Sequence, residues 1–342
     1  MNPQRFFDAH LDLAYLAEMG RDMLADPPDS ADNPAAVTLK SLSESPVRRA
    51  VATIFVQPRG LDSAGDYVDG PWCYGSPDEA YELSLRQIHR YHQWRDNGHV
   101  YIADGKKSIP SKKLELLLLL EGAAGIRDEA DLREFHELGI RILALTWVNG
   151  TRWAGGDQSG GDVTADGLKL LSLADQLGMA HDVSHLSEQA FWTVLEHTER
   201  PKLASHSNCR ALLPGKKHPE RHLSDLQILA LAENNGVIGM NLFSKFLVSS
   251  GNAAIVDLVR HVQHIVDLTG RTDLIGLGSD MDGGFSALEL PVGIRRPADL
   301  ARICDALAAA HFTDQDIAQF AWSNWNDFFV RSGLLQPELS HE

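Results

Sequence analysis

The chain has 342 residues, of which 44% are hydrophobic and 23% are charged, a composition typical of a globular protein with a large core and not of a disordered or collagen-like chain. Its 31 basic and 47 acidic residues give a net charge of −16, which argues against a nucleic-acid partner because phosphate binding needs a basic surface. The three cysteines, Cys73, Cys209 and Cys304, are far apart, so neither a disulfide framework nor a cysteine metal site is expected.

The N-terminal sequence MNPQRFFDAHLDL lacks the charged and then apolar run of a secretory signal. The longest unbroken apolar run, LLLLL at 116–120, is far too short to span a bilayer. We therefore expect a cytoplasmic protein that makes no contact with a membrane.

Short β-branched or leucine-rich runs alternate with longer amphipathic stretches, which is the pattern of repeated βα units around a parallel sheet. Strands are predicted at 5–9, 50–57, 114–120, 140–146, 178–184, 202–206, 236–242 and 274–279. Helices are predicted at 77–97, 128–138, 165–177, 187–198, 222–234 and 254–269, with closing helices within 312–333. This order predicts an α/β fold, a (β/α)8 TIM barrel, formed by residues 1–342 as a single domain.

Three segments interrupt the alternation of strands and helices. Residues 20–48 and 58–75 each follow a strand, so they are expected on the C-terminal face of the barrel as lids or binding loops, with disorder as the alternative. The glycine-rich segment AGGDQSGGD at 154–162 matches no phosphate-binding pattern and is interpreted as a flexible cover.

Side chains of the types that bind metals end or follow several of the predicted strands. They are His10, Asp12, Glu121, His185, His206 and Asp280, and Trp147 and Asn241 occupy the equivalent positions on two other strands. In a barrel these strand ends converge on one mouth. Alternation along HLD points His10 and Asp12 to the same side, while Leu11 packs outward against helices.

A metal centre would explain this arrangement. A single histidine at a strand end is more often a hydrogen-bonded core residue than a ligand, but five such residues at the ends of four strands jointly indicate a metal site. Glu121 follows LELLLLL, so its carboxylate lies at the edge of an apolar layer and needs a cation. His181 has the same parity as His185 and is assigned a packing role deeper in the barrel. Surface positions are expected for eight further histidines, namely His89, His92, His136, His197, His218, His222, His261 and His264.

Five segments, DAHLDL, LLEGAAGI, DVSHLS, ASHSNCRAL and GLGSDMDGG, resemble in order and spacing the membrane dipeptidase (renal dipeptidase) family of the amidohydrolase superfamily. The resemblance extends from about residue 5 to residue 330. It implies a barrel of the metal-dependent hydrolase type that binds two zinc ions. It also implies the hydrolysis of dipeptides, including those whose C-terminal residue has the D configuration.

The resemblance further implies a role for each matched residue. The implied ligand set is His10 and Asp12 for one zinc ion, His185 and His206 for the other, and Glu121 as the bridge between them. Arg221, in ERHLSD, is expected to bind the substrate carboxylate, although the residues PGKKH lengthen the segment between His206 and this arginine. Asp280, in SDMDG, is expected to transfer protons.

One position departs from the family pattern. The fourth strand reads ALTWVNGTRW and has Trp147 where the family has a histidine that binds the substrate carbonyl. Tryptophan offers a single N–H donor and cannot change charge near neutral pH. The substitution therefore weakens the expectation of peptide turnover but leaves the expected metal site unchanged. Trp147 is therefore expected to form an aromatic wall, Arg152 is a candidate substitute donor, and Asn241 is a further candidate substrate contact.

The charges of the expected site predict its substrate and mechanism. Two zinc ions, two carboxylates and a bridging hydroxide leave about one positive charge, so together with Arg221 the mouth is expected to attract a small anionic or zwitterionic substrate. The metal-activated hydroxide is expected to attack the peptide bond, and Asp280 to pass its proton to the departing amine. A homodimer is expected from the resemblance and from the prevalence of two-fold oligomers.

Two other functions stay open at this point. The first is an amidohydrolase that acts on another small amide or a lactone, such as an N-acyl amino acid, which Trp147 favours. The second is a catalytically silent relative that binds a ligand at the mouth, against which the complete ligand set and Asp280 argue. Nucleophilic serine chemistry finds no support because the chain contains no GxSxG motif.

Overall fold

The computed structural model describes residues 5–61, 67–103, 105 and 113–337. Eight parallel strands follow one another in the order β2, β1, β15, β14, β13, β12, β9 and β8, and β2 pairs with β8 to close the barrel. The strands are β1 (Phe6–Leu11), β2 (Val47–Phe55), β8 (Glu115–Glu121), β9 (Ile140–Leu143), β12 (Ala180–Asp182), β13 (Lys202–Ala204), β14 (Val237–Met240) and β15 (Ile275–Leu277). A short extra strand, β7 (Tyr101–Ile102), pairs with the start of β8. The predicted (β/α)8 barrel is confirmed.

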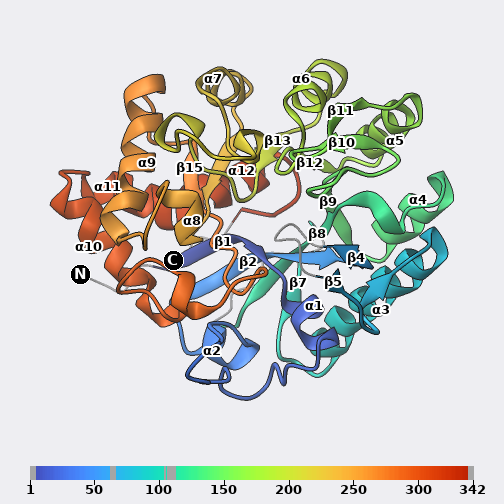
Figure 1. Ribbon diagram of the computed structural model, residues 1–342, viewed down its shortest axis with the longest axis horizontal. Coiled ribbons are helices and arrows are strands. Elements are labelled where there is room, and N and C mark those ends of the chain that lie inside the picture. Colours follow the sequence, from blue (N-terminus) through green and yellow to red (C-terminus); the bar gives the residue numbers. More distant parts are fainter. Residues whose placement is uncertain (1–4, 62–66, 104, 106–112, 338–342) are drawn as a thin grey trace.

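Helices surround the barrel strands (Figure 1). Those that correspond to the predicted helices are α3 (Pro77–Asp96), α4 (Glu129–Glu137), α5 (Ala165–Gln176), α6 (Glu188–His197), α7 (Asp225–Glu233) and α9 (Ile255–Thr269). Polar side chains cap the N-termini of several helices. In α3, the hydroxyl of Ser76 accepts a hydrogen bond from the N–H of Glu79, and Pro77 occupies the first turn. The remaining helices outside the C-terminal segment are α1 (Leu13–Glu18), α2 (Leu39–Ser43), α8 (Ser244–Leu247) and α10 (Ala301–Ala309). In the described part of the chain, no helix combines the length and apolar character needed to cross a bilayer.

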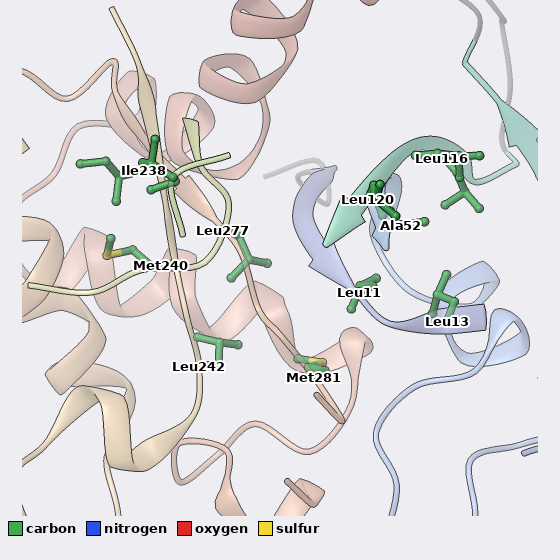
Figure 2. Packing of buried hydrophobic residues seen from close by; sticks show 14 of the residues in the cluster. Leu11, Leu13, Ala52, Leu116, Leu120, Ile238, Met240, Leu242, Leu277 and Met281 are labelled. Carbon is green, nitrogen blue, oxygen red and sulfur yellow. The ribbon is translucent and has the colours of Figure 1, made fainter. Parts of the chain in front are cut away.

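Strand β8 divides its leucine run between two cores. Leu117 and Leu119 belong to the cluster inside the barrel, whereas Leu116 and Leu120 belong to the cluster between the strands and the helices. Figure 2 shows part of this outer cluster. Because side chains alternate along a strand, Glu121 continues the inward series and its carboxylate lies at the mouth of the barrel.

Strand β1 contains a β-bulge next to the mouth. Asp8 and Leu11 are three residues apart on β1, but their partners on β2 are only two residues apart. A bulge changes the direction of the side chains that follow it. Leu11 packs outward against the helices, as predicted, while His10 and Asp12 face the mouth.

The segment 20–48 is folded onto the C-terminal face of the barrel. The carboxylate of Asp282, in the loop after β15, accepts the backbone N–H of Ala36 at 2.9 Å and that of Val37 at 2.9 Å. The guanidinium of Arg21 pairs with the same carboxylate. These contacts order the segment against the loop that also contains Asp280.

The segment 58–75 contains short strand pairs, β3 (Gln57–Pro58) with β6 (Cys73–Tyr74) and β4 (Gly60–Leu61) with β5 (Tyr67–Val68). Residues 62–66 of this predicted loop lie outside the described residues.

The glycine-rich segment 154–162 is not a flexible cover, and that prediction is wrong. It forms an antiparallel hairpin of β10 (Ala154–Gly156) and β11 (Gly160–Val163). A Cβ atom added to Gly155 would lie only 2.1 Å from the carbonyl oxygen of Gly160, so the glycine permits a close approach of the two strands. The turn between them carries the buried residue Asp157.

The C-terminal helices close the end of the barrel that lies opposite the mouth. They are α11 (Asp314–Ala318) and α12 (Asn324–Arg331), joined by a π-helical turn over 319–323. Trp325, Phe328 and Phe329 pack in the interior cluster with Phe7 of β1, and the rings of Phe7 and Phe329 stack at 5.4 Å. The indole N–H of Trp325 donates to the carbonyl of Leu277 at 2.9 Å.

Candidate metal centre and active site

The predicted metal ligands meet around the carboxylate of Glu121, and all of them are buried. Oε2 of Glu121 lies 3.4 Å from Nε2 of His10. Oε1 lies 3.5 Å from Nε2 of His185 and 3.6 Å from Nε2 of His206. Oδ1 of Asp12 lies 3.9 Å from Nε2 of His10. Oε2 of Glu121 thus faces His10 and Oε1 faces His185 and His206, while the rings of His10 and His206 also stack with their centres 3.6 Å apart. The division of these residues into two ligand pairs stays a prediction.

The hydroxyl of Ser205 binds two of the imidazole rings. Its Oγ lies 3.1 Å from Nδ1 of His10 and 2.7 Å from Nδ1 of His206. The hydroxyl hydrogen is donated to Oδ2 of Asp182 at 2.5 Å. Both lone pairs of Ser205 therefore remain to accept an N–H from each ring.

The third ring, that of His185, is held by the glycine-rich hairpin. Oδ2 of Asp157 lies 2.8 Å from Nδ1 of His185, and the backbone N–H of Asp157 donates to the carbonyl of His185 at 2.9 Å. His185 has a φ of 63°, in the left-handed region that histidine seldom adopts. The two bonds from Asp157 fix both this backbone conformation and the orientation of the ring.

These hydrogen bonds assign a proton to Nδ1 of each ring, and each Nε2 then presents a lone pair to Glu121. The Nε2 atoms of His185 and His206 lie 3.0 Å apart, where two lone pairs repel each other unless a proton or a metal ion lies between or beside them. Imidazole nitrogens whose other N–H is hydrogen-bonded, together with carboxylate oxygens, are ligands typical of zinc sites. The donor set therefore fits a metal centre.

The electrostatics of the site also require a cation. Although burial lowers the pKa of His10, the charges of Glu121 and Asp12 raise it to about 10. Burial, reinforced by the charge of Glu121, raises the pKa of Asp12 to about 6. Either a proton on His10 or a metal ion can offset the carboxylate charge, and binding of the metal displaces the proton.

Asp280 lies beside these ligands at the end of β15. One of its carboxylate oxygens is within 4.8 Å of donor atoms of His10 and Asp12, and burial raises its pKa to about 8. Its φ is 57°, and its Oδ2 accepts the side-chain N–H of Asn241 at 2.8 Å. Asn241 is fully buried and is not among the described residues that line the cavity, so it supports Asp280 and is not placed to contact a substrate.

A cavity of about 380 Å³ opens above the ligands, a volume suited to a small molecule. Much of its wall is aromatic, formed by Tyr15, Phe55, Trp147, Phe243, Phe246 and Phe285. Basic side chains also line it, namely Lys216, Lys217, His218, Arg221, His222 and Lys245. Among the described residues, none from 20–48 or 58–75 lines the cavity, so these segments are not placed as binding loops.

Arg221 is buried and has donors that are not saturated. Its Nε lies 3.9 Å from Oδ2 of Asp157 and has no hydrogen-bond partner in the described part of the chain. Its Nη1 is 3.5 Å from Oγ of Ser207, and its guanidinium carbon lies 4.9 Å from the ring centre of Phe246. A buried guanidinium with unfilled donors is suited to bind a carboxylate.

The sequence model of the membrane dipeptidase family, peptidase family M19, matches residues 1–328. The chain belongs to this family. An uncharacterized protein in the pqqA 5' region of Klebsiella pneumoniae is 32% identical over 237 residues, which are 65% of this chain and 84% of that protein. An uncharacterized dipeptidase of Schizosaccharomyces pombe is 28% identical over 259 residues, 72% of this chain and 56% of that protein. As a member of the membrane dipeptidase family, the chain is a hydrolase of the metallopeptidase class.

A solved structure supports the fold assignment. The metallo peptidase of Rhodobacter sphaeroides, liganded with a phosphinate mimic of the dipeptide L-Ala-D-Ala, superposes with a TM-score of 0.81 at 21% identity. The similarity covers 97% of this chain and 100% of the other. At this level of identity the similarity concerns the barrel and its closing helices, not the individual site residues.

In this membrane dipeptidase, Trp147 and Arg152 have different positions. Trp147 lines the cavity, with its ring centre 5.0 Å from that of Phe55 and 6.1 Å from that of His185, so the structure places it as an aromatic wall. Arg152 does not line the cavity in the described structure, which corrects its assignment as a substitute donor. Its guanidinium lies 4.4 Å from the ring of Trp153 and donates to a backbone carbonyl of the loop before α4.

Three histidines outside the ligand set also differ from prediction. His261 was expected at the surface of α9 but is fully buried and hydrogen-bonded through both ring nitrogens. His222, expected in a polar turn, is buried and lines the cavity. His181 does not face the barrel interior, because its Nε2 lies 2.6 Å from Oδ1 of Asp175 on α5.

Three residues that support the ligands were missed in the sequence. Asp182 lies two positions after the interior residue Ala180 on β12. The alternation of side chains along a strand could therefore have predicted that Asp182 points into the barrel. Ser205 directly precedes His206 in ASH, but its other partner, His10, lies on β1, which β14 and β15 separate from β13, so that contact depends on the closed barrel. Asp157 lies in a glycine-rich turn whose sequence gives no indication that it reaches His185.

Proposed function

We propose that this dipeptidase binds two zinc ions, with Glu121 shared between the two ligand pairs. The proposal depends on one observation above all, the convergence of three Nδ1-protonated imidazoles on opposite oxygens of one buried carboxylate. Zinc is favoured because imidazole and carboxylate ligands suit its borderline character, and no cysteine contributes to the set.

Bound zinc supplies polarisation of the scissile carbonyl and activation of a water molecule at neutral pH. Asp280 is positioned to accept the proton of that water and to donate it to the departing amine, which is general base and then general acid catalysis. Asn241 occupies Oδ2 of Asp280, and Oδ1 is left for the proton. Burial raises the pKa of Glu121, but nearby positive charge lowers it overall, and a bound metal ion would supply that charge once the proton of His10 is displaced.

The proposed substrates are small zwitterionic or anionic dipeptides. Arg221 would bind the C-terminal carboxylate with its free donors, and the aromatic wall would contact the side chains. The similar protein from Rhodobacter sphaeroides is liganded with a mimic of L-Ala-D-Ala, which supports the inclusion of dipeptides with a C-terminal D-residue.

A second candidate function is the hydrolysis of another small amide or of a lactone, for example an N-acyl amino acid. The observation that favours it is Trp147, which narrows the cavity beside His185 with an aromatic ring that cannot take up a proton. An acyl group without a free amine suits such an apolar wall.

Metal analysis coupled to a hydrolysis panel tests both functions. We expect two equivalents of zinc per chain, loss of activity on chelation and its return on addition of zinc. The panel compares L,L-dipeptides, L,D-dipeptides, N-acyl amino acids and lactones. Turnover of dipeptides supports the proposal, turnover of only the last two classes supports the alternative, and a chain that binds no metal contradicts both.

A further inference from the structure

The cavity has a basic side close to Arg221. Lys216 and Lys217 lie on the segment before Arg221, and Lys245 lies on α8; all three line the same cavity as the metal ligands. This concentration of positive charge stands out in a chain whose net charge is −16. A cluster of one sign at the rim of a cavity attracts ligands of the opposite charge.

Two of these lysines have no carboxylate to balance them. Lys245 pairs with Glu289 at 3.1 Å, whereas neither Lys216 nor Lys217 has a carboxylate within ion-pair distance among the residues that the structure describes. Nζ of Lys216 donates instead to the backbone carbonyl of Lys245 at 2.6 Å. This bond holds the ammonium group of Lys216 over the cavity, where donors remain for an anion.

The lysine charges also oppose one another. Partial burial, together with the nearby charge of Lys245, lowers the pKa of Lys216. An anion bound beside Lys216 would offset this repulsion. Because Lys216 and Lys217 are only five and four residues from Arg221 along the chain, that anion would lie on the same side of the cavity as a carboxylate bound by Arg221.

An apolar surface lies between the buried Arg221 and Lys245, whose backbone carbonyl accepts a hydrogen bond from Nζ of Lys216. The guanidinium of Arg221 lies over the ring of Phe246, and the ammonium of Lys245 lies 5.3 Å from the ring centre of Phe243. The rings of Phe243 and Phe246 contact each other at 4.9 Å. Such a surface suits the methylene groups of a side chain that begins near Arg221 and ends in a charged group at the rim.

We propose that the site prefers dipeptides whose C-terminal residue carries a second carboxylate, an aspartyl or glutamyl residue. Arg221 binds the α-carboxylate, and Lys216 and Lys217 bind the side-chain carboxylate. This inference depends on the proposed dipeptidase function for the position of the α-carboxylate.

The test compares substrates that differ in charge but hardly in size. For the zinc-loaded full chain, kcat/KM is measured for L-alanyl dipeptides that end in Glu or Gln, in the configuration that is turned over faster. We expect a preference for Glu of about fivefold, the size of a partly screened ion pair, which decreases as ionic strength rises. In the double variant Lys216→Gln/Lys217→Gln, the ratio of the two values should fall to about one.

Lys169→Gln is the matched control, because Lys169 is an exposed residue of α5 that pairs with Asp166 and does not line the cavity. It should keep the full preference for Glu. Equal turnover of both substrates by the wild type, or a preference that survives in the double variant, would overturn the proposal.

A binding measurement separates this proposal from the dipeptidase function. Isothermal titration of the zinc-loaded protein with free glutamate and free glutamine should show tighter binding of glutamate, and the double variant should lose this difference. If no dipeptide is hydrolysed but the difference in binding is present and depends on the lysines, the proposed function fails and the anion site stands. If dipeptides are hydrolysed without any difference in binding or turnover, the anion site fails alone.

Discussion

At the scale of single residues, Asp280 is the side chain that the proposed reaction requires beyond the metal ligands. Asp280→Asn keeps the acceptor for Asn241, and asparagine tolerates the positive φ at this position. We expect the variant to retain its zinc and to lose about 10²- to 10⁴-fold in kcat, the usual contribution of a general acid or base. Zinc content and steady-state kinetics measure the two effects; wild-type kcat in the variant would remove Asp280 from the mechanism.

Ser205 makes a separate contribution, because its hydroxyl holds the rings of two proposed ligands, His10 and His206. Ser205→Ala removes the acceptor for Nδ1 of both His10 and His206. We expect zinc affinity to fall by about 10- to 100-fold, measured by competition with a chelator. The exposed residue Ser172 on α5 provides the control Ser172→Ala, which should bind zinc like the wild type. Equal affinities of the two variants would contradict this role of Ser205.

The residues of the site were predictable to different degrees. His10 and Glu121 could be predicted because their types stand at the ends of strands whose convergence follows from the barrel. The contacts of Ser205 with His10 and of Asp157 with His185 could not, since a hydrogen bond to a ring from a distant part of the chain depends on side-chain geometry that local spacing does not encode. Arg152 failed for the same reason, because stacking on Trp153 directs it away from the cavity.

At the scale of elements, Asp282 connects the segment 20–48 to the loop after β15. Asp282→Asn preserves the positive φ but removes the charge that pairs with Arg21 and one acceptor for the N–H groups of Ala36 and Val37. We expect a loss of roughly 1 to 3 kcal/mol in the free energy of unfolding, the range for buried hydrogen bonds to a charged group. Faster proteolysis within 22–35 should accompany it.

The control for this prediction is Asp26→Asn in the same segment. Asp26 is exposed and, within the described ranges of the chain, pairs with Lys40 alone, so its loss should change neither stability nor the rate of cleavage measurably. If both variants behave alike, Asp282 does not anchor the segment.

The strands of the barrel were predicted more accurately from the sequence than the β-bulge and the hairpin. All eight predicted strands are present, because apolar runs of five to eight residues between amphipathic stretches have few other structures available in a chain of this length. The β-bulge in β1 was not predictable, since it depends on how β1 and β2 pair. The hairpin at 154–162 was not predicted, because glycines normally indicate loops.

At the scale of the whole molecule, His261 makes stability depend on pH. It joins three elements: its Nδ1 accepts the N–H of Cys209 after β13, and its Nε2 donates to the carbonyl of Leu247 at the end of α8. Burial lowers its pKa from 6.5 to about 4. The unfolded chain therefore binds the proton more readily than the folded chain. The contribution of neutral His261 to the free energy of unfolding is fully present above pH 6.5 and is lost as the pH falls towards 4.

The shift corresponds to about 3 kcal/mol of unfolding free energy between these two pH values. Urea unfolding of the wild type and of His261→Gln across this range measures it, and the variant should show a shallower loss of stability on acidification. The exposed residue His197 supplies the control, His197→Gln, which should follow the wild type. Parallel curves for all three proteins would contradict the assignment.

The closed barrel could be predicted from eight repeated units, and the sequence also indicated helices at the C-terminus. That these helices insert Trp325 and Phe329 into the interior beside Phe7 depends on which face of α12 meets the strands, which helical periodicity alone does not settle. The predicted homodimer stays a prediction.

Aromatic residues fill the end of the barrel opposite the mouth, and they determine how substrate enters and products leave. With that end blocked by tryptophan and phenylalanine, substrate enters and both amino acids depart through one opening. If Arg221 binds the C-terminal carboxylate as proposed, the C-terminal amino acid competes with the next substrate for the same donors and is expected to leave last. Accumulated product should accordingly act as a competitive inhibitor.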